Sequence, residues 1–149
     1  MESVEIAASE EIRNLVAGYN AFGDRGRFDD LMELFTPDAV MDIGNGHPYE
    51  GVDQIRGIFT RTSDSMTSGP QPSYVQHHTS PVHITMVDGD HATGRTYFSV
   101  LMTHGLDHWG RYDDKYRRVD GHWRFSHRRV RTDGTTPGGW AARHLGDKS

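Results

Sequence analysis

Residues 108–131 read HWGRYDDKYRRVDGHWRFSHRRVR, and this stretch decides the fold. Two runs with the alternation of a strand, residues 108–119 and 122–131, flank the pair Asp120-Gly121. Asp-Gly between two such runs is a strong hairpin signal, because both residues tolerate the positive φ of a tight turn. The stretch therefore predicts two long antiparallel strands.

The same pattern continues toward the N-terminus. Residues 74–87 and 91–104 form two further strand-like runs, separated by the turn sequence Asp88-Gly89-Asp90. Gly105-Leu106-Asp107 breaks the second run before the hairpin begins. Strands joined by short turns pair antiparallel, so the sequence predicts four consecutive antiparallel strands.

The first quarter of the chain has helical periodicity instead. Apolar residues recur at i, i+3, i+4 and i+7 on either side of the turn Asp24-Arg25-Gly26, and Ser9 is a candidate N-cap. The first segment contains Ile12, Leu15, Val16 and Tyr19, and the second contains Phe28, Leu31, Met32 and Phe35. We expect two helices flanking a tight turn that holds Asp24.

Residues 36–73 connect these helices to the strands. Residues 39–43 suit a short strand, and Tyr49-Glu50 suits a brief extension of it. A third, shorter helix is predicted from Val52, Ile55, Ile58 and Phe59. Residues 62–73 are rich in Ser, Thr, Pro and Gly, and we expect a loop there that can act as a flexible flap.

This order of elements is typical of an α+β fold. It predicts a strongly curved, mostly antiparallel sheet with three helices over its concave face. The chain length of 149 residues fits one domain, which we place at residues 1–134, with a C-terminal tail at residues 135–149. The space between the helices and the sheet is where we expect a ligand pocket.

Composition excludes several classes of function. The net charge is −5, with 16 Lys and Arg against 21 Asp and Glu, which argues against a general nucleic-acid-binding protein. The chain has no Cys, so disulfides and thiolate metal sites are excluded. The acidic start lacks the features of a signal peptide, and no apolar run approaches membrane-spanning length. We therefore expect a soluble, cytoplasmic protein that does not bind membranes.

Asp24 and the pair His77-His78 are the candidates for acid–base chemistry. A carboxylate between two apolar elements can be partly buried and poised to orient a base, although an ordinary turn-forming Asp explains Asp24 as well. Histidine suits proton transfer near neutral pH, although a lone strand histidine is more often structural. No metal-binding or nucleotide-binding motif occurs, so we predict no metal and no cofactor.

Several motifs occur in a specific order along the chain. They are residues 12–35, the closing 34–40, Gln76-His77-His78-Thr79, and residues 88–95, 110–116 and 119–128. Over about residues 10–131, this order resembles that of SnoaL-like domain proteins in the NTF2-like superfamily. The resemblance is to the branch with scytalone dehydratase, hexachlorocyclohexane dehydrochlorinase and bile-acid dehydratase. It implies a cone-shaped fold with a cofactor-free Asp-His dyad inside the cone.

By that resemblance Asp24 is the dyad carboxylate and His77 is the base. His77 is chosen over His78 because its spacing to Gly94 matches the dehydrochlorinase pattern. Adjacent strand residues face opposite sides, and the apolar residues that follow share the parity of His78 instead. These residues are Val82, Ile84 and Met86. A bulge at Pro81 would reverse the parity and turn His77 inward.

The resemblance also implies a set of substrate-binding residues. Arg128 corresponds to an Arg that assists the leaving group, Tyr19 to a tyrosine acid, and Tyr112 to a polar pocket position, with His78 nearby. The leading hypothesis is a lyase, a dehydratase or dehydrohalogenase, acting on a small, largely apolar molecule. An isomerase or polyketide cyclase with the same base remains open. A non-catalytic binding protein or an oxygenase small-subunit-like protein remains open too, and the family implies a homodimer or homotrimer.

Overall fold

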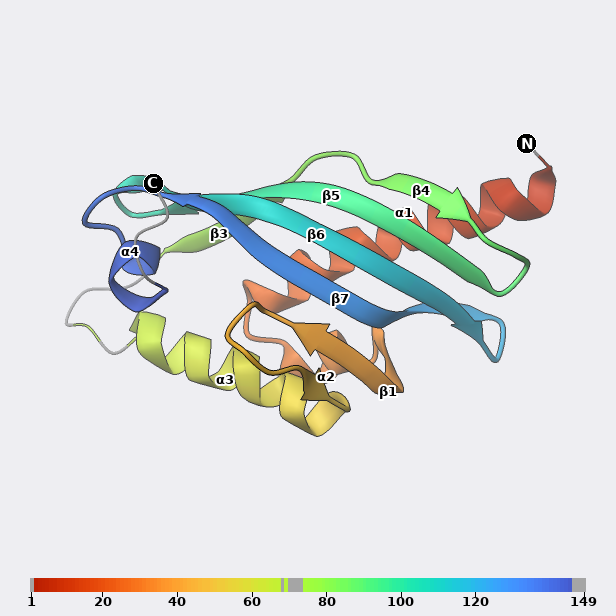
Figure 1. Cartoon of the computed structure of the whole chain (residues 1–149), viewed down its shortest axis with the longest axis horizontal. Coiled ribbons are helices and arrows are strands. Elements are labelled where there is room, and N and C mark those ends of the chain that lie inside the picture. The colour runs from red at the N-terminus through yellow and green to blue at the C-terminus, as the bar shows by residue number, and fades with distance from the viewer. Residues whose placement is uncertain (1, 68, 70–73, 146–149) are drawn as a thin grey trace.

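The computed structural model describes residues 2–67, 69 and 74–145, which form four helices and seven strands (Figure 1). In chain order the elements are α1 (Ser3–Gly23), α2 (Phe28–Met32), β1 (Phe35–Asp42), β2 (Tyr49–Glu50), α3 (Val52–Thr67), β3 (Val75–Thr79), β4 (His83–Met86), β5 (His91–Met102), β6 (Gly105–Val119), β7 (His122–Thr135) and α4 (Trp140–His144). The described helices include none that is long and apolar enough to cross a membrane.

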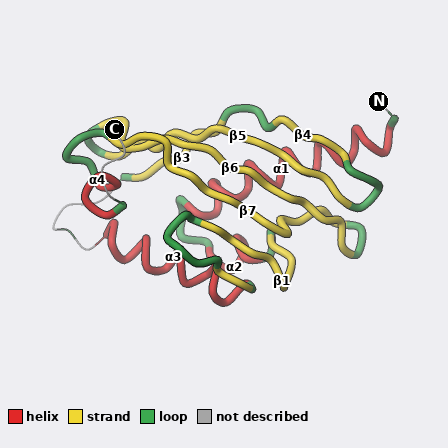
Figure 2. The backbone as a smooth tube through the Cα atoms, viewed as in Figure 1, coloured by secondary structure: helices red, strands yellow, loops and turns green. Residues whose placement is uncertain are grey.

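The strands form one sheet in the order β2-β1-β7-β6-β5-β3, and β4 also pairs with β5. All neighbouring pairs are antiparallel except β1 and β7, which run parallel. The long strands curve across the molecule, with α1 behind them and α3 below them (Figure 2). The α+β prediction of a curved, mostly antiparallel sheet backed by three helices is confirmed.

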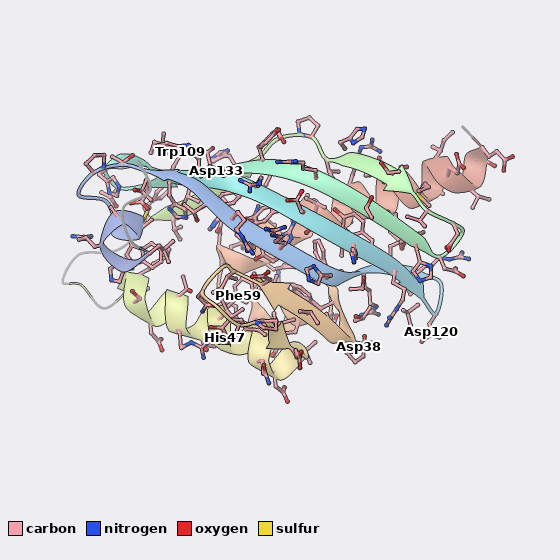
Figure 3. The ribbon with its side chains drawn as sticks, in the orientation of Figure 1. Asp38, His47, Phe59, Trp109, Asp120 and Asp133 are labelled. Carbon is pink, nitrogen blue, oxygen red and sulfur yellow. The ribbon has the colours of Figure 1, made fainter. Side chains whose placement is uncertain are left out.

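The hairpin between β6 and β7 has the predicted turn. Asp120 and Gly121 have φ of 52° and 80°, and Val119 pairs with His122. Positive φ at both central residues gives a turn whose twist matches that of the flanking strands. Figure 3 labels Asp120 at this tip and Trp109 and Asp133 at the opposite end of the two strands.

The strand predicted at residues 74–87 is interrupted near Pro81. Thr79 of β3 pairs with Phe98, whereas His83 of β4 pairs with Arg95. Four steps along the chain from 79 to 83 therefore face three steps along β5 from 98 to 95. One extra residue in this interval reverses the parity of the side chains between β3 and β4, as the bulge hypothesis requires.

Three predicted boundaries differ from the structure. α1 begins at Ser3, and Ser9 is a buried residue inside it rather than its N-cap. α2 ends at Met32, because Phe35 already pairs with β7 as the first residue of β1. α3 continues through residue 67, and within it the Thr60 and Thr67 hydroxyls donate to the Gly57 and Ser63 carbonyls. Of the predicted loop, residues 68 and 70–73 lie outside the described residues.

The hydrophobic core lies between the helices and the concave face of the sheet. It joins the inner faces of α1 and α3 to the inward residues of β1, β5, β6 and β7. Tyr19 is at its centre, with ring centroids 5.6–6.2 Å from those of Phe35, Phe59, Tyr112 and Phe125. Edge-to-face packing of this kind fixes the rings against one another and gives the site a rigid floor.

The predicted C-terminal tail returns to the sheet. α4 packs against β6, and its Trp140 and Ala141 are buried. The Trp140 indole N–H donates to the Ser65 hydroxyl at 3.2 Å, which ties α4 to the end of α3 (Figure 1). A segment predicted as a tail therefore closes one end of the space between helices and sheet. The domain boundary at residue 134 stays a prediction.

Candidate active site

A cavity of about 320 Å³ opens between α1, α3 and the sheet, with α4 at one end. Its apolar walls include Phe28, Met41, Ile43, Ile58, Phe59, Met66, Val75, Phe98, Val130 and Trp140. Its titratable lining residues, among those described, are Tyr19, Asp24, His77, His108 and Tyr112. A mostly apolar pocket with a few convergent polar groups is the usual form of a small-molecule site.

Asp24 and His77 meet at the wall of this cavity. Asp24 is the C-cap residue of α1, where its backbone N–H bonds to the Asn20 carbonyl, so the end of the helix aims the carboxylate at β3. Its Oδ2 accepts the backbone N–H of His77 at 2.8 Å, and its Oδ1 lies 2.6 Å from His77 Nδ1. The two side chains are 17% and 24% exposed.

This double contact determines what His77 can do. A carboxylate accepts hydrogen bonds, so His77 Nδ1 carries the proton of that bond and Nε2 is the ring nitrogen left for a ligand. The carboxylate is also placed to stabilise an imidazolium formed at Nε2. The predicted contact between Asp24 and His77 is present; its catalytic role is taken up below.

His78 points away from the cavity, contrary to its predicted place among the substrate-binding residues. It is exposed, and its Nε2 lies 2.7 Å from Gln76 Oε1. The cause is the alternation of β3, in which residues 75 and 77 are the half-buried positions. The bulge near Pro81 restores the inward parity for Val82, which is buried.

Tyr19 and Tyr112 line the cavity as the sequence predicts, and both rings are almost completely buried. Burial raises the pKa of Tyr19 to about 12, although the nearby Arg128 guanidinium opposes the shift. Burial also raises the pKa of Tyr112 well above its ordinary value. Both phenols therefore keep their protons near neutral pH, which leaves them able to donate hydrogen bonds.

Arg128 is not a lining residue of the cavity, and this corrects its prediction as a substrate-binding residue. It is fully buried beneath the two tyrosines, with its guanidinium carbon 4.1 Å from the Tyr19 ring centroid and 3.8 Å from that of Tyr112. Its Nε and Nη2 donate to the two carboxylate oxygens of Asp114 at 2.8 and 3.0 Å. Arg128 therefore lies against the tyrosine rings, outside the lining of the cavity.

A second Asp-His pair, absent from the sequence predictions, faces the same cavity. His108 is a buried lining residue, and its Nδ1 lies 2.7 Å from Asp107 Oδ2. The His77 and His108 rings are perpendicular, with centroids 6.5 Å apart. On the predicted strand, His108 and Tyr112 are an even number of positions apart, so their side chains face the same side, and this pattern indicates that His108 faces the cavity. It was missed because Gly105-Leu106-Asp107 was interpreted only as a break.

Asp107 is held by several donors. Its Oδ1 accepts the backbone N–H of Trp140 at 2.6 Å, its Oδ2 accepts that of Ala141 at 3.1 Å, and His104 Nε2 lies 2.9 Å from Oδ1. Burial opposes ionisation, but the hydrogen bonds from His108 and these two backbone groups outweigh it and lower the pKa of Asp107. Asp107 is therefore a buried carboxylate that joins α4 to His108.

Burial lowers the pKa of His108, and the nearby His77 lowers it further, although the contact with Asp107 opposes both effects. His108 is consequently neutral near pH 7, with the proton on Nδ1 toward Asp107. The described residues include no group of three or more His, Asp or Glu placed to hold a metal ion. The cavity thus holds two imidazoles, each with a carboxylate at Nδ1.

Comparisons with known proteins agree with this architecture. The family model described as the SnoaL-like domain matches residues 4–129. An uncharacterised protein of Mycobacterium tuberculosis is 33% identical over 138 residues, and the match covers 86% of each chain.

Three solved structures have the same fold. A candidate scytalone dehydratase from Novosphingobium aromaticivorans has a TM-score of 0.78 at 22% identity, over 91% of each chain. The hexachlorocyclohexane dehydrochlorinase LinA type 2 has a TM-score of 0.78 at 19% identity, over 92% of this chain and 93% of its own. The β subunit of a candidate aromatic-ring-hydroxylating dioxygenase from N. aromaticivorans has a TM-score of 0.70 at 19% identity, over 90% and 94%.

At these identities the three structures establish the fold alone. The family match spans most of the chain, and the resemblance stated from the sequence motifs is confirmed. This chain belongs to the SnoaL-like family of the NTF2-like superfamily.

Proposed function

We propose that this protein is a cofactor-free acid–base enzyme, a lyase that eliminates a small group from a largely apolar molecule. The observation that carries the proposal is the Asp24–His77 pair at the wall of an apolar cavity. A neutral imidazole oriented by a carboxylate is a general base, and an apolar wall keeps competing water away from it.

In this mechanism His77 Nε2 takes a proton from a carbon beside an activating group. Asp24 holds the ring in one tautomer and stabilises the imidazolium as it forms. The hydroxyls of Tyr19 and Tyr112 keep their protons and supply donors for negative charge that develops on the substrate. Arg128 acts on the site through these two rings.

Two alternatives follow from the same geometry. An isomerase or polyketide cyclase would use the same proton abstraction, followed by reprotonation or ring closure. A non-catalytic binding protein, or a subunit similar to the dioxygenase β subunit, would use the cavity without the base. The dioxygenase subunit has the fold of this chain, so the fold does not separate these alternatives and an activity measurement must.

The test measures turnover of four carbon acids by the purified protein: scytalone, hexachlorocyclohexane, 4-hydroxy-4-phenylbutan-2-one and 5-nitrobenzisoxazole. His77→Asn is the informative variant, because an Asn amide can still donate toward Asp24 while Nε2 is removed. His78→Asn is the matched control on the outer side of β3. We expect at least one compound to react, with a rate about 10²-fold lower in His77→Asn. Equal rates in both variants would reject the role of His77 as the base, and no reaction of any of the four compounds would favour a binding protein.

The remaining expectations of partner and location are also proposals. We propose that the protein assembles as a homodimer or homotrimer and works in the cytoplasm. Sedimentation velocity at working concentration tests the assembly, and a single monomeric species would contradict it.

A further inference from the structure

The Asp107–His108 pair has no part in the mechanism above, although it lines the same cavity. Asp107 alone caps the start of α4, by accepting two backbone N–H groups. His108 is not needed for that cap, yet its ring faces the cavity with 8% of its side chain exposed. Packing and capping therefore account for Asp107 but leave the placement of His108 unexplained.

The Nε2 atom of His108 is available to a ligand in the cavity. Nδ1 is bound to Asp107, and the hydrogen bonds of the described residues leave Nε2 without a partner. The ring is fixed by aromatic contacts, with centroids 6.1 Å from those of both Phe98 and Trp140. His77 stands across from it at 6.5 Å between centroids, too far for a direct hydrogen bond between the rings. A hydroxyl or carbonyl group of a ligand can contact both.

We propose that His108 is a second catalytic histidine, which exchanges a proton with an oxygen of the substrate at Nε2 while His77 exchanges the proton on carbon. The proposal rests on the proposed role of His77. It selects the substrate class: a β-hydroxy carbonyl compound or the α,β-unsaturated carbonyl compound formed from it by loss of water. A halide departs as an anion and needs no proton, so a second proton-transfer group indicates an oxygen leaving group.

The step balances without a cofactor. In dehydration the C–H proton passes to His77 Nε2, the C–H electron pair becomes the new C=C bond, and the C–O bond breaks. The departing oxygen takes the Nε2 proton of the His108 imidazolium and leaves as water. His77 then returns its proton to solvent and His108 regains one. Hydration is the same step reversed, with neutral His108 accepting a proton from the attacking water.

The charges around His108 fit this exchange. The titratable groups near it are Asp107 on β6, His104 before that strand, His77 on β3 and, behind Trp140, His144 of α4. Asp107 stabilises an imidazolium, whereas burial and His77 disfavour it and lower the pKa of His108. Because His77 disfavours a charge on His108, the pair favours protonation of one ring at a time, and a single proton on the pair is what either direction of the reaction needs.

The test compares two substrates in matched variants. The C–O bond of 4-hydroxy-4-phenylbutan-2-one needs a protonated leaving group, whereas 5-nitrobenzisoxazole releases a stable phenolate after proton removal from carbon. His108→Asn removes Nε2 and can still donate toward Asp107. We expect it to lower the hydroxyketone rate about 10²-fold, and at least about 10-fold more than the benzisoxazole rate. His77→Asn should lower both rates alike, and the exposed His83→Asn should lower neither.

The outcomes separate the two proposals. Equal losses on both substrates in His108→Asn, or no loss on either, would overturn the role of His108. Normal rates in His77→Asn would overturn the proposed function itself. Long-range ¹H–¹⁵N spectra of the unliganded protein decide the matter if neither compound reacts. We expect Nε2 of His108 to take up its proton at a higher pH in His77→Asn than in the wild type, because the substitution removes the charge that lowers the pKa of His108. A titration of His108 that this substitution leaves unchanged would overturn the inference.

Discussion

Replacing Arg128 by Met should cost about 4 kcal/mol of folding free energy without removing a ligand contact. Both side chains of the Arg128–Asp114 pair are fully buried and joined by two hydrogen bonds. Removing one partner of such a pair typically costs ~3–5 kcal/mol, because the other charge stays buried and unpaired. The lost cation–π contacts add roughly 0.5–2 kcal/mol each, which the polarisable Met side chain partly restores.

Urea unfolding of the wild type and of Arg128→Met measures this loss. For a chain of this size, about 4 kcal/mol corresponds to a fall in Tm of roughly 10 °C. Arg129→Met is the matched control, since its side chain is exposed on the other face of β7, and it should change the free energy of unfolding by less than ~0.5 kcal/mol. The double variant Arg128→Met/Asp114→Asn leaves no uncompensated charge and should be more stable than Arg128→Met alone.

Two results would refute this reasoning. If Arg128→Met unfolds within ~1 kcal/mol of the wild type, the buried pair is not a stabilising unit. If its stability is normal and only turnover falls, Arg128 reaches the substrate, as the resemblance implied, and the buried position described above is not the one used in catalysis. A loss of stability that the double variant does not reduce would show that packing of the Arg side chain, and not its charge, is what the core needs.

Three further predictions concern the site. Asp24→Asn should lower turnover by about 10²-fold, measured with any reactive carbon acid, with a Tm close to that of the wild type. Gly139→Ala should destabilise by ~1–3 kcal/mol in urea, because its Cβ would lie 2.5 Å from Asp107 Oδ1, whereas Gly89→Ala meets no atom within 4 Å and should be neutral. The lowered pKa of His108 means that the unfolded chain binds more protons below about pH 6.5, so the free energy of unfolding should fall as pH decreases through that range; the fall should be smaller in His108→Asn.

The fold could be predicted because it rests on local signals. The Asp120-Gly121 turn sets the register of β6 and β7 through its own backbone preference, and α1 follows from apolar spacing within one segment. Boundaries such as the end of α2 could not be predicted, because Phe35 is placed by pairing with β7, some ninety residues away. The continuation of α3 was also missed, because Ser and Thr are typical of turns and loops rather than of helix interiors.

The site was only partly predictable for a related reason. The contact of Asp24 with His77 depends on one bulge near Pro81, and that bulge was available as a hypothesis because proline and side-chain parity are both visible in the sequence. The position of Arg128 depends on its ion pair with Asp114. The pairing of β6 with β7 brings these two residues together. A resemblance indicates which residue corresponds but not how exposed it is, so Arg128 was predicted to bind the substrate although it lies buried beneath the Tyr19 and Tyr112 rings.

The Asp107–His108 pair could not be predicted from the positions of the two residues in the sequence. The two residues are adjacent, and neighbours on a regular strand face opposite sides. The two are both buried here because β6 is irregular near its start, where the ladders with both β5 and β7 shift register. α4 then returns to bury Asp107 and supply two N–H donors. The docked C-terminal segment therefore helps to hold the second Asp-His pair. Removal of residues 136–149 should weaken the Asp107 contact and raise the exposure of His108, while the Asp24–His77 contact, built from α1 and β3, should remain.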